Sequence, residues 1–309
     1  MSLHPKTPNN WGRWGADDQK GALNQLDGDV VLSALAAPTQ GRVLSLSLPI
    51  RGSTSSAAAE TVPHLRGRPL PQHYMSVDGA DYCAGAKPPR GLSIADDALM
   101  ISPHGTSTHM DALCHMWSGN ELYNGHASSR VRSYGAGRCG IEMVDGIVTR
   151  GVLIDVAKHR GVPVMDPADR ISVADLESIS AAGGVAIGKG DAVVLRTGWP
   201  TVYAKSPEQY WKAEPGLSGE AGKWLAERDV TVVASDNSAI SALTTEGGAA
   251  EGLEQDLHLL FLWRHGIYLM EMLWLEDLSA ANVTSFLFMV APLKIVGGTG
   301  SPVNPLAVL

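Results

Sequence analysis

The sequence predicts an α/β protein, and three observations lead to this class. Short apolar runs rich in β-branched residues recur in the second half of the chain. Segments with helical spacing of apolar residues lie between these runs. Strand and helix patterns alternate over roughly residues 146–280, which is typical of a sheet covered by helices. The N-terminal half is richer in strand and loop patterns, and we expect one domain over residues 1–309.

Four segments are predicted as strands of the sheet. Residues 42–50 (RVLSLSLPI) alternate apolar and polar side chains with the period of two that one covered face produces. The other three are continuous apolar runs, which suit strands covered on both faces. They occupy residues 146–157, 191–199 and 230–236. Residues 51–72, rich in Ser, Ala, Gly and Pro, are predicted to form a long surface loop or lid.

Three helices are predicted between and after these strands. Residues 172–183 open with Ser172 as an N-cap candidate and Asp175 three positions later, a variant of the capping box. Residues 218–229 carry apolar side chains at helical spacing. Residues 253–266 end at a glycine, the residue most often found just after a helix C-terminus.

Composition excludes several classes of partner. The formal net charge is −8 and no run of basic residues occurs, which disfavours nucleic acid and anionic membranes as partners. The apolar stretches 257–263 and 286–293 are far shorter than the roughly 20 residues of a membrane span, and the N-terminus lacks an apolar signal region. The three cysteines, Cys83, Cys114 and Cys139, form no CxxC pair and too sparse a set for a disulfide framework, so a cytoplasmic protein is expected.

The stretch HGTSTHMDALCHMWSGNELYNGH (104–126) holds four of the ten histidines. His109 and Asp111 stand two residues apart, so in a strand both side chains lie on one face, with Cα atoms about 6.6–6.8 Å apart. Imidazole nitrogen and carboxylate oxygen are ligands that divalent metals take. The pair therefore predicts a metal site. The alternative is a set of hydrogen-bonded core residues, which we expect for His126.

His115 lies too far along a strand to share a metal with His109, because six residues of strand span about 20 Å. If the chain turns into a helix after Asp111, then Asp111 and His115 lie four residues apart on one helix face. His115 would then stand beside the metal rather than bind it. That is the position of a general acid or base for a metal-activated water.

Another candidate carboxylate lies in the segment 257–278. Glu271 is flanked on both sides by apolar residues, so its pKa would rise unless it is paired or bound to a metal. A salt bridge to Arg264 is the structural alternative. Glu276 and Asp277 are typical of a solvated helix start. The sequence has no GxSxG and no GxxxxGK[ST] motif, which disfavours a serine-hydrolase or P-loop site. The tetrapeptide GGTG (297–300) lacks the GxGxxG pattern and follows no strand-to-helix signal, so it does not support a dinucleotide site.

These residues resemble the metal-dependent cyclase family of hydrolases, which includes bacterial kynurenine formamidase and isatin hydrolase. The family motif is His-x-Gly-Thr-His-x-Asp-x-Pro-x-His, and THMDALCH (108–115) matches its later part, with Leu113 in place of the proline. Other segments are similar to the longer branch of about 300 residues. They are 14–26, 119–125, 150–157, 190–199, 234–239, 266–273 and 297–308.

One departure concerns the first histidine of the motif. Its position is occupied by Gly105, and His104 precedes it. Either a one-residue bulge brings the His104 imidazole to the metal, or His104 does not bind and the site is completed by His258 and Glu271. The latter two resemble the distal His and Glu of the family, which in some members help to hold a second ion.

The resemblance implies a swivelling β/β/α domain with a mixed central sheet and flanking helices, Zn²⁺ or Mn²⁺ as cofactor, and a homodimer or homotetramer. It favours a metal-dependent hydrolase that cleaves an amide or lactam C–N bond of a small cyclic or aryl substrate. The predicted metal residues are His104, His109, Asp111, His258 and Glu271, with His115 as the catalytic acid–base. Trp117, Tyr123 and Trp199 are candidates for the substrate pocket, with core packing as the alternative for each.

Two rival functions stay open. The first is a lactone or ester hydrolase, or a cyclase, acting on the same metal site. The second is a non-catalytic protein that binds a metal or small ligand, which the glycine at position 105 favours.

Overall fold

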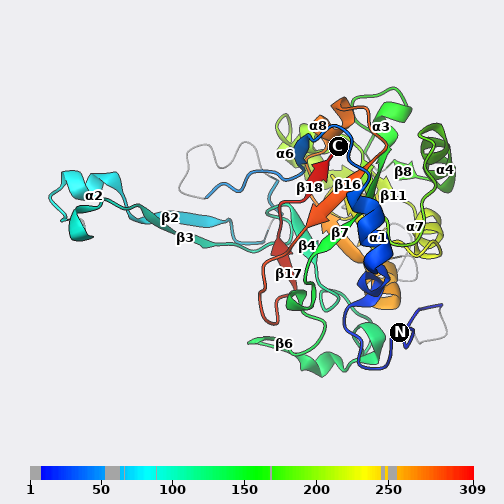
Figure 1. Cartoon of the computed structure of the whole chain (residues 1–309), viewed down its shortest axis with the longest axis horizontal. Helices are drawn as coiled ribbons and strands as arrows, with labels where there is room; N and C mark the ends of the chain where they lie inside the picture. The colour runs from blue at the N-terminus through cyan, green and yellow to red at the C-terminus, as the bar shows by residue number, and fades with distance from the viewer. Residues whose placement is uncertain are drawn as a thin grey trace.

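A nine-stranded mixed sheet forms the centre of the computed structural model (Figure 1). The structure describes residues 8–52, 63–65, 67–87, 89–167, 169–244, 248–249 and 256–309. The strands, in their order across the sheet, are β1 (Val43–Ser45), β18 (Leu306–Val308), β16 (Ser285–Val290), β7 (Ile147–Asp155), β9 (Ala192–Arg196), β12 (Val232–Ser235), β15 (Tyr268–Glu271), β4 (His109–Asp111) and β17 (Gly300–Pro302).

The four middle strands β7, β9, β12 and β15 are parallel, and every other neighbouring pair in this sheet is antiparallel. Because parallel strands end at the same edge, the last residues of all four strands lie along one edge of the sheet. Ligands bind outside the carboxyl ends of strands in open α/β sheets, so this edge is the first place to look for a site. The α/β class with a mixed central sheet and flanking helices is confirmed.

The predicted strands are present. The runs at 146–157, 191–199 and 230–236 form β7, β9 and β12, and all residues of β9 and β12 are buried, as expected for strands covered on both faces. The segment 42–50 contributes only the short edge strand β1, whose two outer residues are exposed. The end of its apolar pattern, Leu46 and Leu48, is buried without continuing the ladder.

Helices flank the sheet. α1 packs on β7 and β16, while α4 contacts both β7 and α7 at the side of the view (Figure 1). The capping box of Ser172 and Asp175 is present at the start of α4, as predicted. The helices are α1 (Gly28–Leu35), α2 (Gly79–Cys83), α3 (Val156–His159), α4 (Val173–Ala182), α5 (Pro200–Tyr203), α6 (Pro207–Lys212), α7 (Gly219–Ala226) and α8 (Glu276–Ala280).

The predicted helix at 253–266 is wider than an α-helix over most of its length. Leu259–His265 forms a π-helix that ends at Gly266 in the left-handed conformation. Residues 253–255 lie outside the described part of the chain. π-Helical turns are rare and are frequent at functional sites. His258 is the residue that directly precedes this turn.

Several smaller elements lie outside the nine-stranded sheet. The antiparallel pair β2 (Gln72–Val77) and β3 (Asp96–Met100) projects far from the body (Figure 1). The other small strands are β5 (Val131–Arg132), β6 (Gly135–Ala136), β8 (Arg170–Ile171), β10 (Ala213–Glu214), β11 (Gly216–Leu217), β13 (Leu243–Thr244) and β14 (Gly248–Ala249). The 3₁₀ turns are Gly21–Gln25, Pro89–Gly91, Tyr123–Gly125, Ser128–Arg130 and Ile141–Met143.

One hydrophobic core runs along the sheet, and a smaller aromatic cluster surrounds Trp199 and Tyr210. All three cysteines are free, in agreement with the expectation of no disulfide framework. Within the described residues, no helix has the length and apolar character needed to cross a bilayer. Part of the predicted surface loop, residues 53–62, lies outside the described residues.

Candidate metal centre

The edge of the sheet at β4 and β15 brings the predicted metal ligands together. β4 runs antiparallel to β15, with His109 directly opposite Glu271. Asp111 follows two residues after His109, so both side chains lie on the same face, as predicted from the period of two. Directly opposite residues in an antiparallel pair have Cβ atoms about 4.5–5.5 Å apart, which explains why these three groups meet.

Five side chains converge at this point. His109 Nε2 lies 3.3 Å from Glu271 Oε2 and 3.6 Å from Asp111 Oδ1. His258 Nε2 lies 3.2 Å from Glu271 Oε1 and 3.7 Å from Asp111 Oδ2. His104 Nδ1 lies 2.9 Å from Asp111 Oδ1. Asp111 is thus the central residue, with one oxygen toward His104 and His109 and the other toward His258.

Two of the imidazoles make a hydrogen bond through the ring nitrogen that faces away from the centre, and the bond of His109 to a carbonyl oxygen fixes its tautomer. His109 Nδ1 lies 2.8 Å from the Ser107 carbonyl oxygen, so its N–H donates there and Nε2 faces the two carboxylates. His104 Nε2 lies 3.1 Å from Thr299 Oγ1, and donation there leaves the lone pair of Nδ1 directed at the centre. Histidines that bind metals nearly always donate their other ring N–H in this way.

These donors fit a divalent cation. His104, His109 and Asp111 offer three ligand atoms within 4.8 Å of one another, and Asp111, His258 and Glu271 offer a second such group. Among the described residues, the buried atoms Asp111 Oδ2 and Glu271 Oε1 have no hydrogen-bond partner. Buried carboxylate oxygens left without donors are costly, and a cation between them would satisfy both. Imidazole and carboxylate without thiolate suit zinc and manganese alike.

The electrostatics of the cluster also demand positive charge at its centre. Burial favours the neutral form of each group, yet the pKa of Asp111 lies far below its usual range because of His115, His104 and His109. Burial lowers the pKa of His258, but Glu271 and Asp111 outweigh burial and raise the pKa to about 9. Without a cation, the two buried carboxylates must hold protons on neighbouring imidazoles. A divalent ion would displace those protons.

His104 reaches the cluster although the motif position after it is a glycine. Gly105 has φ +70°, and a Cβ atom there would lie 2.7 Å from Leu65 Cβ, so a histidine does not fit at 105. Gly300 faces Asp111 across β17 and β4, and a Cβ at 300 would lie 2.6 Å from His104 Cε1. The left-handed turn at 105 and the space at 300 together admit the His104 ring. Of the two alternatives left open by the sequence, the geometry favours the one in which His104 contributes.

His115 reaches the site by a turn and not by a helix. The helix that the sequence allows after Asp111 does not form: residues 113–116 form a turn and a bend, with the His115 N–H donating to the Ala112 carbonyl. The His115 ring stacks on His104 with centroids 3.9 Å apart and planes 8° apart. Burial lowers the pKa of His115 to about 4, with Asp111 opposing and His104 and His258 adding to the effect. His115 is therefore neutral at pH 7.

The three aromatic candidates for the substrate pocket lie in different surroundings. Tyr123 is fully buried and donates its hydroxyl to Asp18, and Trp199 packs on Tyr210 in the smaller aromatic cluster. These contacts agree with core packing, the alternative to a place in the substrate pocket. Trp117 is exposed, and its place in a pocket stays a prediction. His126 bonds to the Asp18 carbonyl, as expected for a structural histidine.

Sequence reasoning missed Thr299, Gly300 and Ser107. The only signal for the first two was the GGTG tetrapeptide at 297–300, whose small residues mark a close approach of backbone to another group. The alternative salt bridge of Glu271 to Arg264 is not the contact observed, because Glu271 pairs with His109 and His258.

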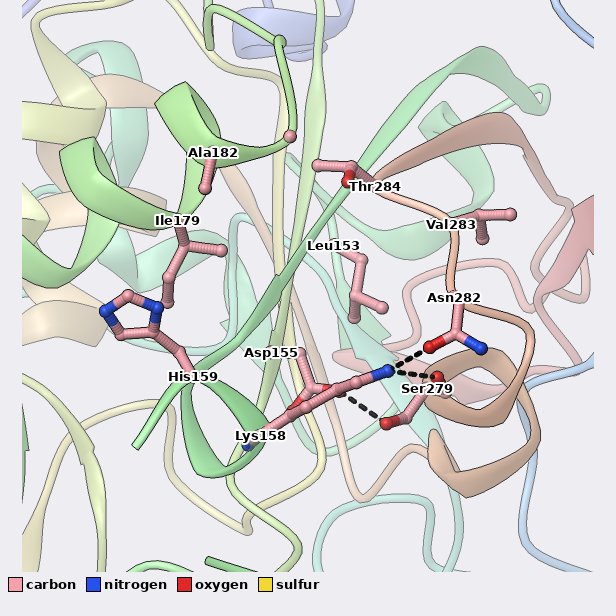
Figure 2. Close-up of a pocket in the computed structure, with 11 residues that line it drawn as sticks. Leu153, Asp155, Lys158, His159, Ile179, Ala182, Ser279, Asn282, Val283 and Thr284 are labelled. Atoms are coloured by element: carbon pink, nitrogen blue, oxygen red, sulfur yellow. Dashed lines mark hydrogen bonds between the residues drawn. The ribbon is translucent and has the colours of Figure 1, made fainter. Parts of the chain in front are cut away.

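A second polar site lies at the other end of the same edge (Figure 2). A cavity of about 250 Å³ there is lined by residues of β7, α3, α4 and the end of α8. Asp155, the last residue of β7, accepts hydrogen bonds from Arg196 and from the Ser279 hydroxyl. Lys158 donates to the Ser279 carbonyl and to Asn282 Oδ1. The charged groups of this second site, Asp155, Arg196 and Lys158, therefore all have hydrogen-bond partners within the protein.

The fold and this donor set point to one family of proteins, the cyclases. Residues 44–242 match the family model described as "Putative cyclase", which covers more than half of the chain. The chain therefore belongs to this family, as the motif at 108–115 predicts. No curated protein matches the chain.

Solved structures agree with the family. A novel cyclase is 32% identical, with a TM-score of 0.88 over 98% of this chain and 100% of that one. Isatin hydrolase A from Ralstonia solanacearum is 22% identical, with a TM-score of 0.60 over 90% of this chain and 96% of that one. A predicted metal-dependent hydrolase from Bacillus stearothermophilus is 18% identical, with a TM-score of 0.51 over 86% and 98%. The last two show the fold alone.

Proposed function

We propose that the chain is a metal-dependent hydrolase that cleaves an amide or lactam C–N bond of a small cyclic or aryl substrate. One observation carries the proposal: five imidazole and carboxylate side chains converge with two unpartnered buried oxygens, and a neutral imidazole lies directly beside them. The likeness in fold to isatin hydrolase A supports a cyclic amide as the substrate class.

His104, His109, Asp111, His258 and Glu271 would hold the metal. When bound, a divalent cation supplies Lewis-acid chemistry, lowering the pKa of water toward about 7 and polarising a carbonyl group. His104 and His258 are the most exposed side chains of this set, at 11% and 17%, so a substrate would reach the cluster on their side. His109 and Asp111, each 1% exposed, are closed off from solvent.

His115 carries the proton transfers. Its low pKa makes it an unprotonated imidazole at neutral pH, able to accept the proton of the attacking water. It then returns that proton to the leaving nitrogen as the C–N bond breaks, so that the amide and water become a carboxylic acid and an amine. Its stacking on His104 fixes the plane of the ring beside the donors.

The same site would act on a lactone or ester, because the attack on the carbonyl is shared. An amine is the poorer leaving group and depends more on a proton from His115. An aryl formamide, a five-membered lactam and the matching lactone therefore separate the two functions. With the lactam as the preferred substrate, His115→Ala should lower its turnover by about 10²–10⁴-fold.

The test begins with chelator treatment followed by reloading with Zn²⁺ or Mn²⁺. We expect turnover to disappear and return, and elemental analysis to find metal in both the parent and the His115→Ala variant. His126→Ala is the matched control, because that imidazole binds a backbone carbonyl outside the cluster. Metal binding without chelator-sensitive turnover of any of the three substrates would favour the non-catalytic alternative.

A further inference from the structure

A cleft lies between α4 and α7, two helices in contact at one side of the body (Figure 1). Its volume is about 460 Å³, and it is called the α4–α7 cleft below. Pockets that bind small molecules measure roughly 300–1,000 Å³, so the cleft has the size of a ligand site. None of the described residues that line it belongs to the proposed metal and acid–base set. A ligand in this cleft would therefore be separate from the substrate of the metal centre.

Trp224 of α7 forms one wall of the cleft and positions two charged side chains. Its indole N–H donates to Glu177 Oε1 at 3.2 Å, and Arg228 lies over its ring, with Cζ 3.3 Å from the ring centroid. Arg228 Nη1 also donates to the Trp224 carbonyl oxygen at 3.1 Å. Contacts of this kind restrict both long side chains before a ligand arrives, which lowers the entropic cost of binding.

Glu177 and Arg228 carry opposite charges, yet they do not pair with each other. Within the described part of the chain, neither forms an ion pair, and each is held by a different part of Trp224. The neighbouring charges of α7, Glu220 and Lys223, are paired with each other. The α4–α7 cleft thus presents one positive and one negative group, and both are available to charges on a ligand.

The rest of the lining is apolar or small. Val185 and Ile187 follow α4, and Ile187 is buried while Val185 is half-buried. Ala181 leaves room beside them. The Ser180 hydroxyl donates to a carbonyl oxygen of its own helix, so it needs no partner from a ligand. An apolar ligand body over these residues gains free energy because apolar surface on both sides is removed from water.

We propose that the α4–α7 cleft binds a small α-amino acid with an apolar side chain. The ligand carboxylate meets Arg228, because a planar guanidinium suits the geometry of a carboxylate. The ligand ammonium meets Glu177, and the ligand side chain covers Val185 and Ile187. A simple acid or a simple amine matches only one of the two charges, so the zwitterion is preferred.

The experiment compares three ligands that share one apolar body. Phenylalanine carries both charges, 3-phenylpropanoate lacks the ammonium group, and 2-phenylethylamine lacks the carboxylate. By calorimetry on the full metal-loaded chain, phenylalanine should bind at least about 10-fold more tightly than either of the others. That factor is the loss expected from one charge-assisted hydrogen bond.

Substitutions then locate the site. Arg228→Gln should weaken phenylalanine binding at least about 10-fold. Glu177→Gln should do the same, but it should leave the Kd of 3-phenylpropanoate unchanged. Glu220→Gln, the same change at a paired carboxylate of α7, is the matched control and should leave every Kd unchanged. Ala181→Phe keeps both charges and fills the cleft, so it should abolish binding without removing a contact of Trp224.

The metal centre is the competing location, because amine nitrogen and carboxylate oxygen are also metal ligands. Asp111→Ala removes the central metal ligand and should bind phenylalanine like the parent. The proposal is overturned by no binding of phenylalanine to the parent, by equal affinities for the three ligands, or by binding that survives both Arg228→Gln and Ala181→Phe. Loss of binding in Asp111→Ala would overturn it as well, by placing the ligand at the metal. None of these measurements uses turnover, so they leave the hydrolase proposal untouched.

Discussion

Two buried clusters of charged residues lie at opposite ends of one edge of the sheet. They compensate the charge of their buried carboxylates in different ways. At the end of β7 and β9, Asp155 faces Arg196, which also donates two hydrogen bonds to Glu276. At the end of β15, Glu271 and Asp111 face only imidazoles. The first cluster is closed by its own guanidinium, whereas in the second the buried Asp111 Oδ2 makes no hydrogen bond. A buried carboxylate with a built-in cation supports the fold, and one without it is available to bind.

The effects on pKa differ in the same way. Burial disfavours the charged Arg196, but its hydrogen bonds to Glu276 and Asp155 keep its pKa above the ordinary value. That guanidinium cannot be displaced by a metal. Imidazoles release their protons near neutral pH, and a divalent ion can take their place.

The largest expected effect comes from removing the central ligand. In Asp111→Ala we expect loss of bound metal and a fall in turnover of at least about 10³-fold, which exceeds the roughly 10–100-fold cost of losing an outer partner of a ligand. His109→Ala should behave in the same way. Elemental analysis and the lactam assay measure both. Full metal occupancy in Asp111→Ala would contradict the role of the cluster.

The opposite pattern is expected at the closed cluster. Asp155→Ala leaves Arg196 buried with one partner fewer and should lower the free energy of unfolding by about 3 kcal/mol. Metal content should stay at the level of the parent, because Asp155 makes its contacts with Arg196, Ser279 and Lys158. Urea unfolding and elemental analysis check the two halves. Loss of metal in this variant would erase the distinction between the clusters.

Much of the centre was predictable from local patterns. The period of two placed His109 and Asp111 on one face, and apolar runs located β7, β9 and β12. The pairing of Asp155 with Arg196 was not predictable, because it depends on the register of two strands about 40 residues apart. The roles of His258 and Glu271 came from family resemblance, since only long-range packing brings them to β4.

The points that the sequence left open depend on contacts it does not reveal. Good helix formers after Asp111 suggested a helix, but Cys114 donates its N–H to Cys139 and the chain turns to follow that contact. The choice between two roles for His104 depended on Leu65 and Gly300, which lie far from it in sequence. Tyr123 and Trp199 are buried in the core. The sequence alone does not distinguish an aromatic residue of the core from one that lines a pocket.

Glu214 tests an intermediate case, a buried carboxylate with hydrogen bonds and no ion pair in the described residues. Burial raises its pKa to about 7, although Ser238 donates to both of its oxygens. The folded state thus holds a proton that the unfolded chain, with an ordinary value of 4.5, gives up earlier. The contribution of Glu214 to the free energy of unfolding should therefore be greatest below pH 4.5. It should fall by about 3 kcal/mol as the pH rises through 7.

The measurement is urea unfolding of the parent and Glu214→Gln between pH 4.5 and 8. The amide cannot ionise, so this share of the pH dependence should vanish in the variant. Equal slopes in the two proteins would show that the carboxyl group is ionised throughout and that burial does not control it.

The smallest expected effect concerns how the open cluster is held in place. Thr299→Val removes the hydrogen-bond partner of His104 Nε2 while keeping the shape of the side chain, and should weaken metal affinity by about 10–100-fold. Thr299→Ser keeps the hydroxyl and should bind metal like the parent. Gly300→Ala pushes a methyl group against His104 Cε1 and should act at least as strongly as Thr299→Val. Metal titration by calorimetry distinguishes these variants, and unchanged affinity in both Thr299→Val and Gly300→Ala would mean that His104 stands outside the metal centre and that His258 and Glu271 complete it.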